Sequence, residues 1–521
     1  MINPLFKFLS KNYGKIILVF ILIAAAFLRL YKIMDYMTFL GDEGRDVLVV
    51  YKILHGKLTL LGPTASVGGF FLGPIYYYFM TPFLWLFNYN PVGPAVMVAL
   101  FGIATVWLIY KVGKEFFGSL VGLTAAGLYA ISPLVVTYSR SSWNPNLMPF
   151  FSLLTLYLVY KSLKKNGVKL FILSGILFGI AMQLHYLALF LGVIIFTYVL
   201  LYQFTYSKNF LSKIIKQYAS FFLGFMLGWS PFLAFEIRHG FTNIISIINF
   251  VLKPQDINVS GHFFGIVGNV SLRVFGRLVA NFPASEKISS WSEMSIACWS
   301  YFTIILGIAS VGFLTYKCFK EYKLRSADFA KFSLLLLWLI FGVGLFGFYR
   351  KSIYDYYFGF MFPLPFLIVG ILIKNLWAKK MGKIFGISIL LILVWLNSLT
   401  PPYKYPANRQ LNQAEEISRF VINKTNNKPF NFALITGGNS DHAYRYFFTV
   451  WHKEPMTIQN EIIDPKRKTV TDQLLIVCEG PQCYPLGNSL WEIAGFGRAE
   501  IVGEWKASVV KVFKLEHFKG K

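Results

Sequence analysis

Long apolar runs recur along the sequence from residue 16 to residue 399. Each run is rich in leucine, isoleucine and phenylalanine, and as a helix each is long enough to cross the roughly 30 Å hydrocarbon core of a bilayer. Charged residues make up only 14% of the chain, where soluble domains carry about 25%. The sequence therefore predicts a mainly α-helical, polytopic membrane protein. The runs counted as spans, eleven in all, lie at 16–31, 92–110, 120–138, 147–160, 170–184, 187–202, 218–235, 296–316, 332–348, 354–373 and 384–399.

The composition becomes ordinary after residue 399, where Pro401 and Pro402 open a more polar segment. Apolar residues there follow helix and strand periods in turn. We therefore expect a transmembrane domain at 1–400 and a small α/β domain at 401–521. The elements expected in the second domain are a helix at 408–423, a strand at 430–436, a helix at 443–452, a strand at 473–478 and a hairpin at 499–515.

Two cysteines, Cys478 and Cys483, lie in the second domain. In an oxidising compartment they can bridge and close a short loop. Two free thiols are the alternative.

The net charge of +26 would suit a nucleic-acid partner, so the distribution of the charge has to be examined first. Lysines gather in alternate connections between the predicted spans, and by the positive-inside rule these connections face the cytoplasm. The basic excess is therefore a topology signal, and no nucleic-acid partner is expected. We expect a multi-pass protein of the plasma (cytoplasmic) membrane with a cytoplasmic N-terminus and an extracytoplasmic second domain. The basic connections hold Lys7, Lys11 and Lys15; Lys111 and Lys114; Lys161, Lys164, Lys165 and Lys169; Lys208, Lys213 and Lys216; and the lysines of 317–331 and 374–383.

The apolar run at 70–87 does not fit as a span, because counting it would move every later lysine-rich connection to the outside. It contains two prolines and several tyrosines, which is typical of a segment at the membrane interface. We expect a juxtamembrane helix there. A twelfth span that violates the charge rule is the alternative.

The densest group of charges lies just beyond the first span, in the motif Leu40-Gly-Asp-Glu-Gly-Arg-Asp46. Four of five consecutive residues, Asp42, Glu43, Arg45 and Asp46, are ionisable, in a first outer loop placed at 35–73. Such a cluster at a membrane surface predicts a reaction centre. Alternatively, the two leading acids only cap a helix, since acids are favoured in the first turn.

These features together resemble the GT-C glycosyltransferases, nearest to the protein O-mannosyltransferase and lipid A aminoarabinose-transferase types. The resemblance covers roughly residues 1 to 400 and is carried by Asp42-Glu43 after the first helix, Gly73-Pro74 in the juxtamembrane stretch, the outer loop 139–146, His185-Tyr186 and the predicted spans. It implies transfer of a sugar from a polyprenyl-phosphate donor to a protein, lipid or glycan acceptor on the outer face, with inversion. Asp42 matches the catalytic carboxylate of the family, and Glu43 is expected to orient it, bind the acceptor or hold a metal. Arg45 and Asp46 are expected to bind substrate.

The polyprenyl phosphate is the leaving group of this reaction, and its negative charge requires a cation near the outer interface. Cationic residues follow three predicted spans on that side, and the long outer loop 236–295 begins at one of them. Each of these residues also fits a role as an interfacial anchor. The candidates for substrate binding are Arg140, Arg238 with His239, Arg350 with Lys351, the pair His185 and Tyr186, and Asn144, which stands where some relatives place an acidic residue.

A metal cofactor is left open. A divalent metal is compatible with the family, but the sequence has no His-x-x-x-His, and an amide at Asn144 is a poor metal ligand. A polytopic transporter or lipid flippase without glycosyl transfer is the alternative function. Such a protein would be expected to place ionisable residues or broken helices at mid-membrane, whereas the middles of the predicted spans are almost uncharged.

Overall fold

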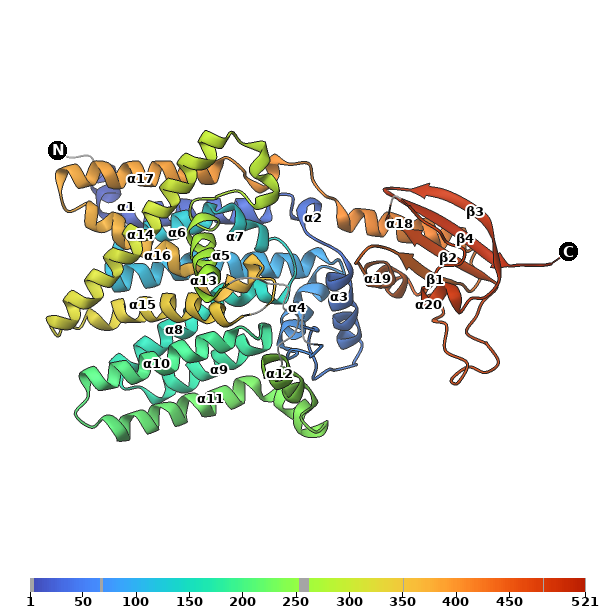
Figure 1. Cartoon of the computed structure of the whole chain (residues 1–521), viewed down its shortest axis with the longest axis horizontal. Coiled ribbons are helices and arrows are strands. Elements are labelled where there is room, and N and C mark those ends of the chain that lie inside the picture. The colour runs from blue at the N-terminus through green and yellow to red at the C-terminus, as the bar shows by residue number, and fades with distance from the viewer. Residues whose placement is uncertain (1–3, 66–68, 253–261, 350, 481, 521) are drawn as a thin grey trace. The chain divides into compact units, whose positions relative to one another are not determined.

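The computed structural model describes residues 4–65, 69–252, 262–349, 351–480 and 482–520. The chain divides into two compact units (Figure 1). The membrane unit contains residues 1–31, 59–76 and 96–405, and the tail unit contains residues 32–58, 77–95 and 406–521. The first outer loop, expected within a domain at 1–400, thus gives part of its length to the tail unit.

Helices make up the membrane unit. Their bounds are α1 (Pro4–Leu30), α5 (Val92–Phe117, which begins in the tail unit), α6 (Ser119–Ile131), α7 (Pro133–Tyr138), η1 (Asn144–Leu147), α8 (Met148–Lys165), α9 (Val168–Leu184), α10 (Ala188–Tyr206), α11 (Phe210–Arg238), α12 (Thr242–Leu252), α13 (Phe263–Gly276), η2 (Ser285–Ser290), α14 (Glu293–Lys323), α15 (Phe329–Gly344), η3 (Leu345–Phe348), η4 (Asp355–Met361), α16 (Pro363–Leu376), α17 (Lys380–Ser398) and η5 (Pro402–Lys404).

All eleven predicted spans contain helix. Among the described residues, seven helices are long and apolar enough to cross a membrane, or up to eight if the bent pair of η4 and α16 forms one span. The run at 120–138 is broken between α6 and α7, where Pro133 begins the second helix, and α9 is only 17 residues long. The total of eleven spans stays a prediction.

Helix α4 (Ile75–Leu86) occupies the run expected at the interface. It has 12 residues and contains Pro82, so it is too short to cross the hydrocarbon core, which takes about 20 residues. A short helix agrees with a juxtamembrane segment, and its depth in the bilayer stays a prediction.

Helices α9 and α11 pack with their backbones in close contact. Gly175 and Gly179 on α9 face Gly224 and Gly228 on α11, and an added Cβ on Gly175 would lie 2.0 Å from the carbonyl oxygen of Phe221. Small residues four apart allow this approach between membrane helices, where dispersion forces supply much of the attraction. A larger side chain at any of these positions would separate the two helices.

The tail unit combines a four-stranded sheet with short helices. The strand order is β1-β2-β4-β3, with β1 parallel to β2 and the other two pairings antiparallel. Apolar side chains of β2 and β4, among them Leu474, Ile476 and Phe513, form the core of the unit. The disulfide Cys478–Cys483 follows the end of β2. The elements are α2 (Ile33–Tyr36), α3 (Gly41–Leu54), most of α4, α18 (Gln410–Lys424), β1 (Asn431–Ile435), α19 (His442–Val450), β2 (Gln473–Cys478), α20 (Trp491–Ala494), β3 (Ala499–Ala507) and β4 (Val510–His517).

The first prediction concerns topology. In a Cys298→Ser background, a cysteine at position 509 should react with a membrane-impermeant maleimide added outside intact cells, and a cysteine at position 114 should react only after the membrane is opened. Both native side chains, Val509 and Lys114, are exposed on the surface of the chain. Labelling of position 114 from the outside would contradict the predicted orientation.

Candidate active site

Helix α3 begins within the acidic motif. Leu40 stands at its N-cap and has no polar side chain to accept a backbone N–H, so the carboxylate of Glu43 fills that role instead. Its Oε2 accepts the N–H of Leu40 at 3.0 Å. Carboxylates are favoured in the first turn of a helix because unpaired N–H groups point toward them. Glu43 is therefore a helix cap, as the alternative interpretation expected for both leading acids.

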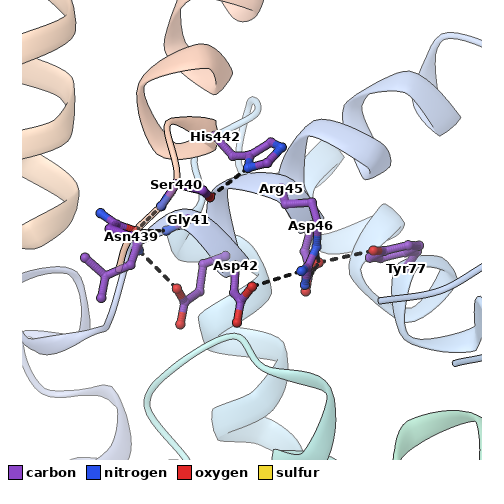
Figure 2. A network of polar contacts seen from close by, with 10 residues as sticks. Gly41, Asp42, Arg45, Asp46, Tyr77, Asn439, Ser440 and His442 are labelled. Atoms are coloured by element: carbon purple, nitrogen blue, oxygen red, sulfur yellow. Dashed lines mark hydrogen bonds and ion pairs between the residues drawn. The ribbon is translucent and has the colours of Figure 1, made fainter. Parts of the chain in front are cut away.

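Asp42, Arg45 and Asp46 form a line of ion pairs on α3 that ends at Tyr77 of α4 (Figure 2). The Arg45 guanidinium donates Nη1–H to Asp42 Oδ1 at 2.9 Å and Nη2–H to Asp46 Oδ1 at 2.8 Å. The hydroxyl of Tyr77 donates to the same Asp46 oxygen at 3.2 Å. Asp46 is fully buried, whereas 58% of the Asp42 side chain is exposed. The buried carboxylate therefore holds the guanidinium, and the guanidinium holds the exposed carboxylate.

Burial raises the pKa of the two buried acids of this cluster. Loss of hydration raises the pKa of Asp46 to about 6, although Arg45 opposes the shift. It also raises the pKa of Glu43 to about 7, against the effect of the hydrogen bond from Leu40. The other oxygen of Asp46, Oδ2, is buried and has no hydrogen-bond partner in the described part of the chain.

Two of the other predicted residues hold loops of the membrane unit in place. Arg140 is buried and donates to the carbonyl oxygens of Leu28 at 2.5 Å and Tyr31 at 2.6 Å. Asn144 is also buried and donates to the Leu184 carbonyl at 2.6 Å. Both side chains therefore join a loop to the end of a helix.

His185 and Tyr186 lie between α9 and α10. Nδ1 of His185 accepts the N–H of Leu187 at 3.2 Å, so that nitrogen carries no proton. The imidazole stacks on the Tyr186 ring at 4.7 Å, and the Tyr186 hydroxyl shares a hydrogen bond with that of Tyr349 at 2.8 Å. The pair therefore belongs to a cluster of aromatic side chains.

The remaining predicted cations are Arg238, His239, Arg350 and Lys351. Arg238 ends α11 and is exposed, and His239 stacks on Phe235. Lys351 is half-buried. Arg350 lies outside the described residues.

A cavity in the membrane unit is lined by charged side chains that the sequence did not predict as site residues. It has a volume of about 790 Å³ and is lined by Arg273, Arg277, Asp355, Trp143 and Tyr356 among others. Arg273 binds Asp355 Oδ1 at 2.5 Å, and Arg277 binds Oδ2 at 2.6 Å. The available signal was the spacing of two arginines four residues apart, at the end of an apolar helix, α13.

Ligands for a metal do not gather in the part of the chain that the structure describes. No group of three or more histidine, cysteine, aspartate or glutamate side chains is close enough there to hold an ion. Asp42, the exposed acid of the motif, forms an ion pair with Arg45.

Comparison with known proteins finds one family model that matches part of the chain. Residues 72–235 match the family model of the dolichyl-phosphate-mannose-protein mannosyltransferases. None of the curated protein sequences compared with the chain matches it.

Several solved structures share the fold. One is ArnT from Cupriavidus metallidurans, solved bound to undecaprenyl phosphate, with a TM-score of 0.62 and 11% sequence identity. The match covers 96% of this chain and 98% of the ArnT chain. Another is the archaeal oligosaccharyltransferase AglB from Archaeoglobus fulgidus, solved with an inhibitory peptide and a dolichol-phosphate. Its TM-score is 0.54 at 13% sequence identity, and the match covers 90% of this chain and 70% of the AglB chain. The expected resemblance to the GT-C glycosyltransferases is confirmed, and at these identities the likeness establishes the fold alone.

The second prediction follows from the burial of Glu43. Its folded pKa of about 7 lies above the ordinary value of 4.5, so the folded state binds the proton more tightly and loses stability as pH rises from about 4.5 to about 7. Glu43→Gln keeps an oxygen for the Leu40 N–H but cannot ionise. We expect it to stabilise the protein by about 1–3 kcal/mol at pH 8 and by almost nothing at pH 4.5.

Thermal unfolding of both proteins across this pH range measures the difference. Glu416→Gln, at an exposed position of α18, is the matched control. An equal effect of Glu43→Gln at every pH would contradict the assignment.

Proposed function

We propose that the protein is an integral-membrane glycosyltransferase that moves a sugar from a polyprenyl-phosphate carrier to a protein, lipid or glycan acceptor on the outer face of the plasma membrane. The observation that carries the proposal is the exposed carboxylate of Asp42, held by Arg45 within a chain that is otherwise poor in charge. The fold shared with ArnT and AglB, both solved with a polyprenyl-type phosphate, supports the class of donor.

In the proposed reaction Asp42 is the general base. Its carboxylate takes the proton of an acceptor hydroxyl while the hydroxyl oxygen attacks the anomeric carbon of the donor sugar. The bond between that carbon and the phosphate oxygen breaks, and the polyprenyl phosphate leaves with the electron pair. Attack from the side opposite the phosphate inverts the configuration of the anomeric carbon.

Exposure decides among the three acids of the motif. Glu43 accepts the Leu40 N–H from a buried position, and Asp46 is fully buried against Arg45 and Tyr77. A base has to come within about 3 Å of the hydroxyl that it deprotonates. Asp42 meets that requirement without any rearrangement of the helix.

The leaving phosphate needs a cation, and we assign that role to Arg277. Arg273 uses three N–H groups, two for Asp355 Oδ1 and one for the carbonyl of Ile353. Arg277 forms an ion pair with Asp355 Oδ2 through Nη1, and no other ion pair or hydrogen bond of its guanidinium is found among the described residues. Its remaining donors suit a phosphate, which arginine binds through two N–H groups. Asp355 then serves to orient both arginines.

The third prediction tests the base. Asp42→Asn keeps the size of the side chain and can still accept from Arg45, but it cannot take a proton. Loss of general base catalysis should lower kcat roughly 10²- to 10⁴-fold. The measurement is release of polyprenyl phosphate from a radiolabelled polyprenyl-phosphate sugar by purified protein in lipid nanodiscs, with the products identified by mass spectrometry.

Asp472→Asn, at an exposed position of the tail unit, is the control and should match the parent. Activity of Asp42→Asn within a factor of a few of the parent would exclude Asp42 as the base. A protein that moves intact donor lipid across the bilayer but never breaks the sugar–phosphate bond would instead be a flippase.

The fourth prediction tests the phosphate site. Arg277→Gln removes the cation but keeps a donor to Asp355, and it should raise KM for the donor roughly tenfold or more, with Arg277→Lys in between. Free polyprenyl phosphate should inhibit the parent and fail to inhibit Arg277→Gln at the same concentration. Unchanged KM and unchanged inhibition would show that the phosphate binds elsewhere.

A further inference from the structure

The backbone at the start of α3 is bound by a side chain that lies far along the sequence. Oδ1 of Asn439 accepts the N–H of Gly41 at 2.8 Å and also the N–H of Ser440 at 2.9 Å (Figure 2). The chain separation between Gly41 and Asn439 is 398 residues. Helices normally obtain such an acceptor from the N-cap residue itself, but here the N-cap is Leu40. Glu43 accepts the N–H of Leu40, and Asn439 adds an acceptor for the next N–H, that of Gly41.

A carboxylate fixes the orientation of the Asn439 amide. Nδ2 of Asn439 donates to Glu479 Oε1 at 3.1 Å and Oε2 at 3.2 Å. A carboxylate cannot donate, so the nitrogen of the amide faces Glu479 and the oxygen faces Gly41. Glu479 is itself held by hydroxyl groups, since it accepts from Tyr444 at 2.7 Å and from Thr436 at 2.8 Å.

Two glycines let the helix approach the tail segment closely. An added Cβ on Gly41 would lie 2.1 Å from Ser440 Oγ, and one on Gly44 would lie 2.3 Å from the backbone nitrogen of Ala443. Cβ atoms do not come so close to other atoms in folded proteins. The first turn of α3 and residues 439–443 therefore fit together backbone to backbone.

We propose that Asn439 and Glu479 are positioning residues for Asp42, and we call the pair the Asn439–Glu479 clamp. Asp42 directly follows Gly41, so the hydrogen bond to Asn439 fixes the turn that carries the proposed base. The clamp touches no reacting atom. Misplacement of a catalytic group by about 1 Å can cost roughly 10²-fold in rate. This inference rests on the proposed function for its kinetic consequence and on the structure of the tail unit for its physical one.

The first test is Asn439→Ala. It removes the acceptor of the Gly41 N–H, so amide hydrogen exchange in a peptide covering residues 38–48 should become roughly five- to tenfold faster. The value of kcat should fall at least tenfold while KM for the donor changes less than threefold, because the first turn carries the base and not the phosphate site. Gly437→Ala, two residues earlier, is the matched control, since an added Cβ meets nothing within 4 Å there.

The second test exchanges the two groups of the clamp. Asn439→Asp places a carboxylate against Glu479 and should lower kcat by a similar factor. Adding Glu479→Gln restores a donor and an acceptor, because the new amide at position 479 can donate to the new carboxylate at position 439, which still accepts the N–H of Gly41. The double variant should recover kcat to within about threefold of the parent and restore slow exchange in residues 38–48.

The clamp and the proposed function fail in different ways. Parent-like exchange in Asn439→Ala, or a double variant no better than Asn439→Asp, would overturn the clamp even if the protein transfers sugar. If the parent transfers no sugar, the proposed function fails, and exchange in residues 38–48 still decides whether Asn439 holds the turn. A loss of kcat accompanied by an equal rise in KM would also overturn the positioning role.

Discussion

One guanidinium shared by two carboxylates organises the proposed reaction centre. Asp46 is buried and binds Arg45 through two N–H groups, and the exposed Asp42 binds the same guanidinium through a third. A buried acid without this partner would be costly, since an unpaired charge loses its hydration. The ion pair thus gives two acids of similar intrinsic chemistry different roles, with Asp46 as a support and Asp42 as the group that meets solvent.

Several polar side chains in the membrane unit bind backbone carbonyls of other segments. Asn397 donates to the carbonyl of Val279, Ser132 to that of Leu278, and Gln183 to that of Gly228 within α11. Backbone carbonyls without partners are costly where water is excluded. Two of these donors bind Leu278 and Val279, which directly follow Arg277 of the cavity, so they hold the segment that begins there.

Much of the fold could be read from the sequence because it follows from periodic patterns. Each apolar run forms helix, the strand expected at 473–478 is β2 (Gln473–Cys478), and the helix expected at 408–423 is α18 (Gln410–Lys424). The acidic motif was also visible, because four charges in five residues stand out in an apolar chain. Contacts between distant residues carry no such pattern. Tyr77 is one of three consecutive tyrosines, and only the fold selects it as the partner of Asp46.

The arginines of the cavity were missed for another reason. The sequence predicts phosphate-binding cations at the ends of predicted spans, but Arg273 lies on α13 and Arg277 directly follows it, within the connection at 236–295. Asp355 is the first residue of η4, so it lies far along the sequence from both arginines. Asn439 could not be found at all, since an asparagine in a polar loop is ordinary and its contact is with a backbone N–H.

The distance along the chain between Gly41 and Asn439 also has a consequence for biosynthesis. At about 5–20 residues per second, a ribosome needs roughly 20–80 seconds to add the 398 residues that separate them. Throughout that time the helices of the membrane unit can insert while the N–H of Gly41 lacks the acceptor that Asn439 provides. A segment made late therefore completes the first turn of the helix that carries Asp42, and a chain that ends before Asn439 would leave that turn without this hydrogen bond.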